Sequence, residues 1–382
     1  MSRIRILVFS SYTKPYYSGS GLNALSLAKQ LKFQGNKVSI LTYSWNCRKS
    51  LLDSIDGLTV VRIPVFSSLF FIKFFGRAYL TLILPPFLLF LRFKYKQLIV
   101  YGAFQGYILL IFFARLFAFK IMFRSTMLGS DDVLTLTAKS KIRRHIFSNI
   151  DYYYATTPAF KKHFIKALPN SKAKVFLTTP GVDVNIYNPT AKGLKVKPNS
   201  PIALTFISIG NLVPRKGYEE IFKELSKLNF NYKYLVLGAE RRVDHFNWHS
   251  DITMQTIKEK GIKLLGQKVE FIGWTDDVQS YLERSDILIL NSKSEGLPNS
   301  LLEAMACGVV PVSRKIEGLS NYLLINKENS FEFSNPKEIV EILNELHMNS
   351  ELLNMISFNA RRTVENSFSF SEAVKQIVNA LN

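Results

Sequence analysis

Short apolar runs alternate with longer stretches of helical periodicity along most of the chain. β-branched and aromatic runs predict strands, and the first half of the sequence holds six of them, at residues 5–9, 37–43, 98–101, 121–124, 152–156 and 175–177. Residues 22–33 predict an amphipathic helix. This order of strands and helices predicts a parallel sheet with right-handed crossovers.

The alternation breaks and then restarts. Gly-Val-Asp at 181–183 is followed by Asn188-Pro189 and by the polar stretch 191–201, which predicts a linker. Beyond it a helix is predicted at 218–228, and strands at 203–209, 232–237, 269–272, 287–290 and 309–312. A chain of 382 residues is too long for one ordinary core. We therefore expect an α/β protein with two doubly wound domains, residues 1–188 and 189–369, and ligands at the carboxyl ends of the strands.

The charge of the chain points to an anionic partner. Lys and Arg number 49 against 29 Asp and Glu, a formal net charge of +20. Basic and aromatic residues are interleaved at 70–77, 92–96 and 115–120. Cations on an apolar surface favour contact with an anionic membrane surface, while the alternative is core helices with solvated Lys and Arg. No nucleic-acid-binding motif occurs, so nucleic acid is not an expected partner.

No segment is expected to cross a bilayer. The longest uncharged run of this region, residues 78–91, contains Pro85-Pro86 and is shorter than the ~20 residues of a spanning helix. The apolar run 6–9 is too short for a signal peptide. Cys47 and Cys307 fit no metal or disulfide pattern, which favours a reducing compartment. We expect a cytoplasmic protein, peripheral on the inner face of the cell membrane.

The segment after the predicted strand 287–290 has features of a ligand-binding loop. Residues 291–298 predict a turn and 301–307 a helix with Asn299 and Ser300 in its first turn. The free N–H groups and positive dipole end of such a helix bind anions, for example a diphosphate. Glu295 precedes the helix and Glu303 lies about one turn in, where carboxylates can bind sugar hydroxyls. Alternatively, Glu303 is a solvated helix residue and Asn299 a cap.

Residues 285–308 resemble the signature of the family 4 glycosyltransferases, with two glutamates separated by seven residues and Glu-Ala-Met-Ala-Cys-Gly at the end. Segments 209–217, 269–274, 181–183 and 368–371 also lie where the family has its motifs. The resemblance implies the GT-B fold, with two doubly wound Rossmann-like domains facing across a crevice. It implies a hexosyltransferase-type enzyme whose last helix, about 370–382, packs back on the first domain.

The resemblance also implies a donor site. Glu295 would face the transferring sugar, and Lys216 would neutralise the phosphate charge in place of a metal. The donor would be a UDP- or GDP-sugar, with no cofactor and no metal ion. Glu303 would hold the ribose, residues 296–299 the sugar, and the N–H groups of Ser300 and Leu301 the diphosphate. The donor-binding residues implied are Gly19, Gly21, Asn211, Arg215, Gly273, Trp274, Gly296, Leu297, Pro298, Asn299, Ser300, Leu301 and Glu303.

Two places depart from the family pattern. Asn211 stands where the family usually has Arg; Arg215 either supplies this cation or lies exposed in a turn. Residues 125–132 lack the His-Gly pair that lines the donor sugar in the family, although Asp131 and Asp132 occur there. The glycine loop 17–21 either approaches a ligand or is a plain tight turn. Four histidines have no evident partner arrangement: His145, His163, His245 and His249.

We therefore expect a retaining glycosyltransferase that moves a sugar from a nucleotide sugar to a membrane-associated or glycan acceptor, such as a lipid-linked oligosaccharide, in polysaccharide or glycolipid assembly. Two alternatives stay open. A non-catalytic scaffold subunit would bind the sugar nucleotide without turnover. A GT-B sugar-nucleotide epimerase would turn over the donor without an acceptor.

Overall fold

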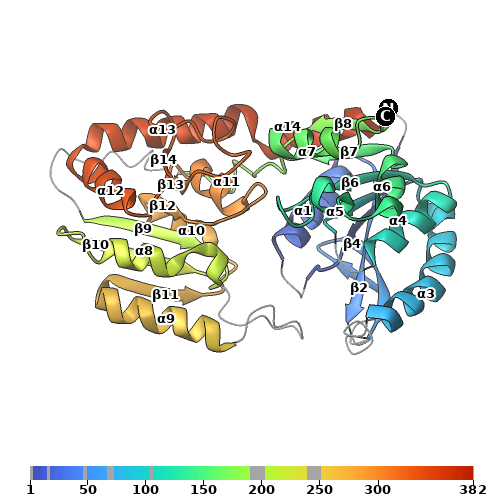
Figure 1. The fold of residues 1–382 in the computed structure, drawn as a ribbon. Coiled ribbons are helices and arrows are strands. Elements are labelled where there is room, and N and C mark those ends of the chain that lie inside the picture. Colours follow the sequence, from blue (N-terminus) through green and yellow to red (C-terminus); the bar gives the residue numbers. More distant parts are fainter. Residues whose placement is uncertain are drawn as a thin grey trace. The chain divides into compact units, whose positions relative to one another are not determined.

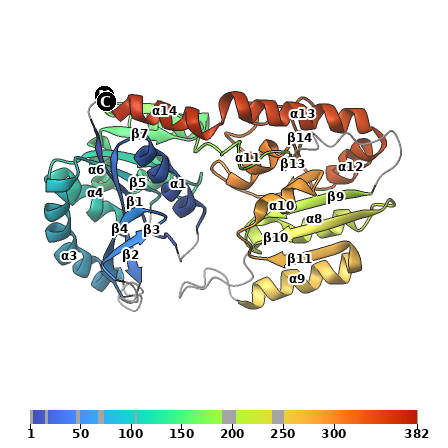
Figure 2. The same ribbon diagram turned by 180° about the vertical axis from the view of Figure 1, so that it is seen from behind.

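The computed structural model describes residues 3–14, 18–45, 50–66, 73–103, 106–189, 203–238 and 251–381. The chain divides into two compact units, Met1–Pro180 with Val374–Asn382, and Gly181–Ala373 (Figures 1 and 2). The sequence predicted the first division a few residues later, at 188/189. Some predictions concern residues outside the described ranges: Tyr17, part of the segment 70–77, the linker 191–201, Cys47, His245 and His249.

The first unit contains an eight-stranded sheet of order β3-β4-β2-β1-β5-β6-β7-β8. Every neighbouring pair is parallel except the antiparallel pair β3–β4 at one edge. The strands are β1 Arg5–Ser10, β2 Lys37–Trp45, β3 Leu52–Ile55, β4 Leu58–Val65, β5 Gln97–Tyr101, β6 Lys120–Arg124, β7 Tyr152–Ala155 and β8 Lys174–Leu177.

Helices cover both faces of this sheet. They are α1 Gly19–Phe33, α3 Lys73–Lys94, α4 Tyr107–Leu116, α5 Val133–Thr137, α6 Lys141–Ser148, α7 Pro158–Ala167 and most of α14, Phe370–Leu381. An aromatic cluster joins β6 to α6: the rings of Phe123 and Phe147 have centroids 4.9 Å apart. The rings of Tyr153 and Phe164 stack at 4.3 Å and join β7 to α7.

The second unit is built on a six-stranded parallel sheet of order β11-β10-β9-β12-β13-β14. Its strands are β9 Leu204–Ile209, β10 Tyr232–Leu237, β11 Val269–Gly273, β12 Ile287–Leu290, β13 Val310–Arg314 and β14 Phe331–Phe333. Its helices are α8 Tyr218–Leu225, α9 Asp251–Leu265, α10 Val278–Glu283, α11 Asn299–Ala306, α12 Glu338–Met348 and α13 Ser350–Ser367, with 3₁₀ turns η1 Pro214–Lys216 and η2 Gly266–Lys268.

The sheet of the second unit is buried on both faces. Phe206 of β9 packs in a core with α8, α9 and α12, whereas its neighbour Ile207 packs in a second core with α10 and α11. Parallel strands buried on both faces consist of near-continuous apolar runs, which is why the sequence located them well. The predicted α/β class is confirmed for both units.

Helix α3 contains the uncharged run 78–91 of the sequence. It spans 22 residues and continues through Pro85 and Pro86. Leu80, Leu84, Leu88 and Leu91 of this helix are buried. Within the described ranges, no helix combines the length and the apolar character needed to cross a membrane.

Candidate active site

The second sheet changes winding direction between β9 and β12. From central β9 the chain adds β10 and β11 on one side, whereas β12 pairs with β9 on the other. Loops that leave the carboxyl ends of two such strands diverge and leave room for a ligand. Lys216 follows β9 and Glu295 follows β12, so the topology places the two predicted catalytic residues at this switch point.

Glu295 lies between two cations. Lys216 donates a hydrogen bond from Nζ to Glu295 Oε1 at 2.7 Å, and Arg215 donates from Nη1 to the same oxygen at 3.0 Å. Arg215 also donates to the carbonyl oxygen of Ser294. The side chains of Lys216 and Glu295 are only 13% and 12% exposed, so solvent screens their attraction weakly.

Electrostatics keep Glu295 ionised. Burial alone raises the pKa of a carboxyl group, but Lys216 and then Arg215 oppose it and hold the pKa of Glu295 below its ordinary value. One carboxylate therefore faces two cations at the switch point. The cluster is one positive charge in excess, which suits it to a further anion.

Glycines at the ends of β9, β10 and β11 leave the backbone beside this cluster without side chains. Gly210 follows β9 with φ of 149°, and a Cβ there would lie 2.9 Å from Cε of Lys216. Gly238 follows β10, and a Cβ there would lie 2.0 Å from the Gly210 carbonyl oxygen. Gly273 ends β11 with φ of 77° and open space where a Cβ would be, next to Trp274, which is 47% exposed. Asn211 is half-buried in the tight turn after Gly210.

A polar network that the sequence did not reveal fixes the two loops. Asn291 donates from Nδ2 to the Gly217 carbonyl oxygen at 3.0 Å and to Glu220 Oε2 at 2.7 Å. Arg314 donates to Asn291 Oδ1 at 2.8 Å and to Glu220 Oε2 at 3.1 Å. Gly217 has φ of 66°, and a Cβ would lie 2.4 Å from Asn291 Nδ2. The network ties β12 and β13 to the start of α8 and so positions the neighbouring Lys216.

Helix α11 starts without a side-chain cap. Its N-cap residue is Pro298, and Leu301 donates its N–H to the Pro298 carbonyl oxygen at 3.2 Å. The N–H groups of Asn299 and Ser300 precede that first bond and are placed at the positive end of the helix dipole. Leu297 is buried in the core, so its side chain anchors the loop. Gly296 is also buried.

Glu303 has a partner that the sequence did not reveal. The hydroxyl of Tyr187 hydrogen-bonds to its carboxyl group. Burial raises the pKa of Glu303 to about 7, and the Tyr187 bond opposes that rise. Arg361 holds the tyrosine segment, because its guanidinium donates to the carbonyl oxygens of Tyr187 at 2.6 Å, of Val184 at 3.2 Å and of Ala306.

This raised pKa predicts a pH-dependent stability. The folded state binds the Glu303 proton more tightly than the unfolded chain, so the stabilisation is complete below about pH 4.5 and is lost as pH rises through 7. A pKa difference of this size corresponds to at most about 3 kcal/mol, and less because Glu303 is only half-buried. We expect Glu303→Gln to flatten this part of the curve of unfolding free energy against pH, measured by urea titration.

Tyr187→Phe is the matched variant for that measurement. Removing the Tyr187 hydroxyl takes away the hydrogen bond that lowers the pKa of Glu303. The pH range in which stability is lost should therefore move upward. Curves for wild type and Glu303→Gln that stay parallel from pH 5 to 8 would contradict the assignment.

The chain is similar in sequence to known glycosyltransferases. Residues 195–363 match the family model described as glycosyl transferases group 1. A phosphatidylinositol N-acetylglucosaminyltransferase component from Arabidopsis thaliana is 25% identical over 84% of this chain and 69% of its own length. An Escherichia coli UDP-Gal:alpha-D-GlcNAc-diphosphoundecaprenol alpha-1,3-galactosyltransferase is 24% identical over 57% of this chain and 56% of its own length.

Residues 195–363 belong to the group 1 glycosyltransferase family. Among solved structures, the Anabaena HepE protein in complex with UDP-glucose aligns with a TM-score of 0.76 and 16% identity, over 99% of both chains. This similarity confirms the predicted GT-B fold, with two Rossmann-like units, for this glycosyltransferase.

In the first unit of the glycosyltransferase, the glycine loop has a local explanation. Ser18 caps α1 and accepts the N–H of Gly21 at 3.0 Å. A Cβ at Gly21 would lie 2.3 Å from the carbonyl oxygen of Tyr12, whereas one at Gly19 would meet nothing. Gly21 is therefore required for packing against the turn after β1. A role of Gly19 and Gly21 in donor binding stays a prediction.

The two aspartates of the 125–132 loop organise the transferase backbone. Asp131 accepts from Thr126 N and Met127 N, both at 2.7 Å. Asp132 caps α5 by accepting from Thr135 N at 3.1 Å, and its Oδ1 lies 2.9 Å from Nδ1 of His163. His163, which had no evident partner in the sequence, is thus paired with a buried carboxylate.

Within the described ranges, no three His, Cys, Asp or Glu side chains gather as metal ligands would. Catalysis without a metal stays a prediction. Cys307 is buried.

Proposed function

We propose that this glycosyltransferase uses a nucleotide sugar, UDP- or GDP-linked, and transfers the sugar with retention of anomeric configuration, without a metal or other cofactor. The observation that carries the proposal is the Glu295–Lys216–Arg215 cluster at the switch point of the second sheet. Its excess positive charge and the start of α11 suit a diphosphate. The HepE neighbour, solved with UDP-glucose, supports this donor class.

Each part of the donor has a matching group. The diphosphate would take the N–H groups of Asn299 and Ser300 and the ammonium of Lys216. The ribose would hydrogen-bond to Glu303, which Tyr187 and Arg361 hold in place. The base of the nucleotide would pack against the backbone of Gly273, where no side chain intervenes, next to Trp274. Glu295 would face the sugar and stabilise positive charge at its anomeric carbon in the transition state.

A thermal-shift screen of UDP-, GDP- and ADP-sugars tests the donor. We expect one nucleotide to raise the melting temperature, since a ligand at 100 times its Kd stabilises by about 2.7 kcal/mol. No shift with any of them would contradict the proposal. Binding without transfer would favour the scaffold alternative, and donor turnover without an acceptor the epimerase.

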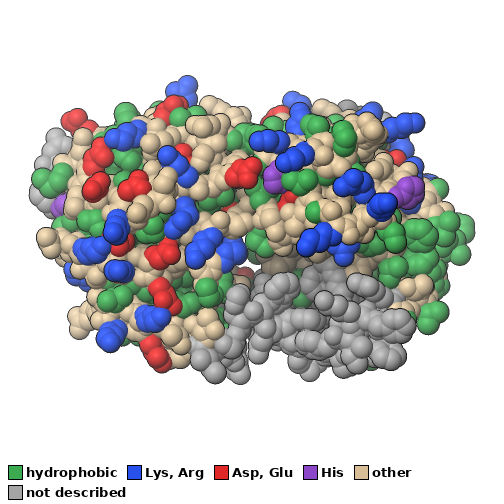
Figure 3. Space-filling model, in the orientation of Figure 1, with side chains coloured by type: hydrophobic (Ala, Val, Ile, Leu, Met, Phe, Trp, Pro, Cys, Tyr) green, Lys and Arg blue, Asp and Glu red, His purple; other side chains and the backbone are tan. Residues whose placement is uncertain are grey.

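The acceptor we propose is a membrane-associated or lipid-linked glycan, reached from the cytoplasmic face of an anionic membrane. Both relatives named above carry a lipid in their names, phosphatidylinositol in one and diphosphoundecaprenol in the other. Large apolar side chains are exposed on α3 and α4, and green side chains gather over these helices in Figure 3. They are Leu82, Leu89, Phe90, Phe93, Phe112 and Leu116.

Cations lie among these apolar residues. Lys94 and Lys96 are exposed, and the Lys94 ammonium lies 4.7 Å from the centroid of the Phe90 ring. Since α3 already buries a leucine face in the core, its second apolar face has no partner among the described residues. An apolar surface with a cationic margin suits the interface of an anionic bilayer.

Binding to vesicles with phosphatidylglycerol is expected at low salt and should weaken as salt rises. Phe93→Ser should reduce the bound fraction severalfold in a sedimentation assay, because Phe93 is 76% exposed on this face. Phe33→Ser is the matched control, because Phe33 is 89% exposed but lies on α1. Equal effects of the two substitutions, or no binding at low salt, would argue against this surface.

A further inference from the structure

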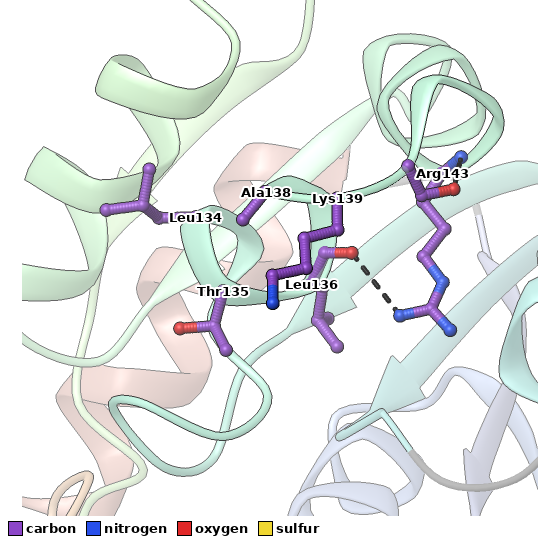
Figure 4. A pocket seen from close by; sticks show the side chains of 7 residues that line it. Leu134, Thr135, Leu136, Ala138, Lys139 and Arg143 are labelled. Atoms are coloured by element: carbon purple, nitrogen blue, oxygen red, sulfur yellow. Dashed lines mark hydrogen bonds between the residues drawn. The ribbon is translucent and has the colours of Figure 1, made fainter.

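The first unit contains a groove between α5 and α6. It has a volume of about 710 Å³, within the range of about 300–1,000 Å³ that ligand pockets occupy. Its walls come from α5, the following turn and the first turns of α6 (Figure 4). The residues that line it are Leu134, Thr135, Leu136, Ala138, Lys139, Ser140 and Arg143.

The groove is cationic and free of acids. Lys139 and Arg143 extend from the backbone on either side of Leu136 in Figure 4. The Arg143 guanidinium donates a long hydrogen bond, 3.4 Å, to the Leu136 carbonyl oxygen, which orients it. Residues 133–150 contain no Asp or Glu. Among the described residues, no carboxylate lies within ion-pair distance of either cation.

The remaining wall limits what the ligand can be. Leu134, Leu136 and Ala138 present apolar surface beside the two cations. The hydroxyl of Thr135 donates to Asp132 at 2.7 Å and so keeps only acceptor capacity for a ligand. The Asp132 carboxylate is therefore occupied by Thr135, by backbone N–H groups and by His163. The groove suits an anionic group joined to an uncharged body.

The place of the groove in the fold also favours a ligand. Helix α5 follows the loop that leaves the carboxyl end of β6, and ligands of parallel sheets bind at that edge. The hydroxyl of Tyr107 of α4 is buried and makes no hydrogen bond; burial raises the pKa of this phenol, and the charge of Arg143 opposes the rise. Tyr107 does not line the groove, but its buried hydroxyl is a further polar group without a partner within reach of the Arg143 charge.

We propose that this groove binds the phosphate group of the acceptor, with Lys139 and Arg143 as its ligands and the leucine wall against the acceptor body. The inference deepens the proposed function, because it names the chemistry of the acceptor. A phosphate of this kind comes either from a lipid, as a prenyl phosphate, or from a soluble sugar phosphate.

The test measures phosphate binding to the full chain with UDP or GDP present in excess, so that the donor site is filled. Geranyl phosphate and glucose 1-phosphate represent the two sources, and geraniol and methyl glucoside are their neutral counterparts. We expect one of the two phosphates to bind and its neutral counterpart not to bind. Lys139→Gln and Arg143→Gln should each weaken that binding about tenfold, as the loss of a charge-assisted hydrogen bond does.

The neighbouring cations provide matched controls. Lys141 and Arg144 are exposed on α6 and do not line the groove. Lys141→Gln and Arg144→Gln should leave phosphate binding within twofold of wild type. Equal losses in both pairs of variants, or no binding of either phosphate to wild type, would overturn the proposal. Calorimetry on the same variants measures the binding of UDP and GDP separately. If neither nucleotide binds, the donor assignment is contradicted, not the phosphate groove.

Discussion

Replacing Glu295 with alanine or glutamine is expected to abolish sugar transfer while the protein stays folded. The carboxylate is ionised, because Lys216 and Arg215 outweigh the effect of burial on its pKa. A fixed negative charge at the transferring sugar stabilises positive charge that develops only in the transition state. Loss of one such group lowers kcat by about 10²–10³. Steady-state kinetics with the nucleotide sugar found in the screen would measure this.

Donor binding should respond in the opposite sense. In the ligand-free protein Glu295 neutralises part of the charge of Lys216 and Arg215. Glu295→Gln keeps the size of the side chain and frees both cations for the diphosphate, so donor affinity should stay equal or rise. Glu341→Gln, on the exposed face of α12, is the control for a lost carboxylate elsewhere. Near-normal turnover in Glu295→Gln would falsify the assigned role.

The sequence predicted most strands, including the edge strands β8 and β11. Strands β9 and β12 are continuous apolar runs because alternate residues enter two different cores. The strands β3, β4 and β14 were not predicted. β3 alternates between exposed and half-buried residues, and β14 has only three residues, so neither carries a strong apolar signal.

Helix α3 shows a limit of local rules. A proline inside a helix removes a backbone hydrogen bond and clashes with the preceding turn. In α3 the buried leucines on both sides of Pro85 and Pro86 pack into the core, and this packing maintains one helix across the pair. Tertiary contacts of this kind cannot be inferred from a window of sequence.

The sequence predicted the motif residues of the site but not the residues that hold them in position. Lys216 and Glu295 are 79 positions apart in sequence; the family resemblance assigned both to the donor site, but their hydrogen bond was not predicted. Glu220 is 71 positions from Asn291 and 94 from Arg314, and of these three residues only Asn291 lies in a recognised motif segment, 285–308. Tyr187 was missed for the same reason. Arg215 was left between two interpretations, and the structure shows its guanidinium on Glu295 with a side chain still 36% exposed.

Lys216→Ala is the second substitution with a large expected effect. The Lys216 side chain is 13% exposed and lies over Gly210, where a Cβ would come within 2.9 Å of its Cε. Its charge is therefore held at one place and weakly screened, and we expect it to act on the donor diphosphate. Donor affinity should fall tenfold or more, and kcat further, because charge on the leaving diphosphate grows in the transition state.

Comparing a nucleoside diphosphate with its nucleoside isolates this effect. Calorimetry should show a large loss of UDP or GDP affinity in Lys216→Ala and an unchanged affinity for uridine or guanosine, which lack the phosphates. Arg215→Ala should cost less, because Arg215 is more exposed and its charge better screened. If Lys216→Ala weakens nucleoside and nucleotide equally, the loss comes from the shape of the site. If it weakens neither, the diphosphate is bound elsewhere, and the start of α11 with Asn299 and Ser300 becomes the principal anion site.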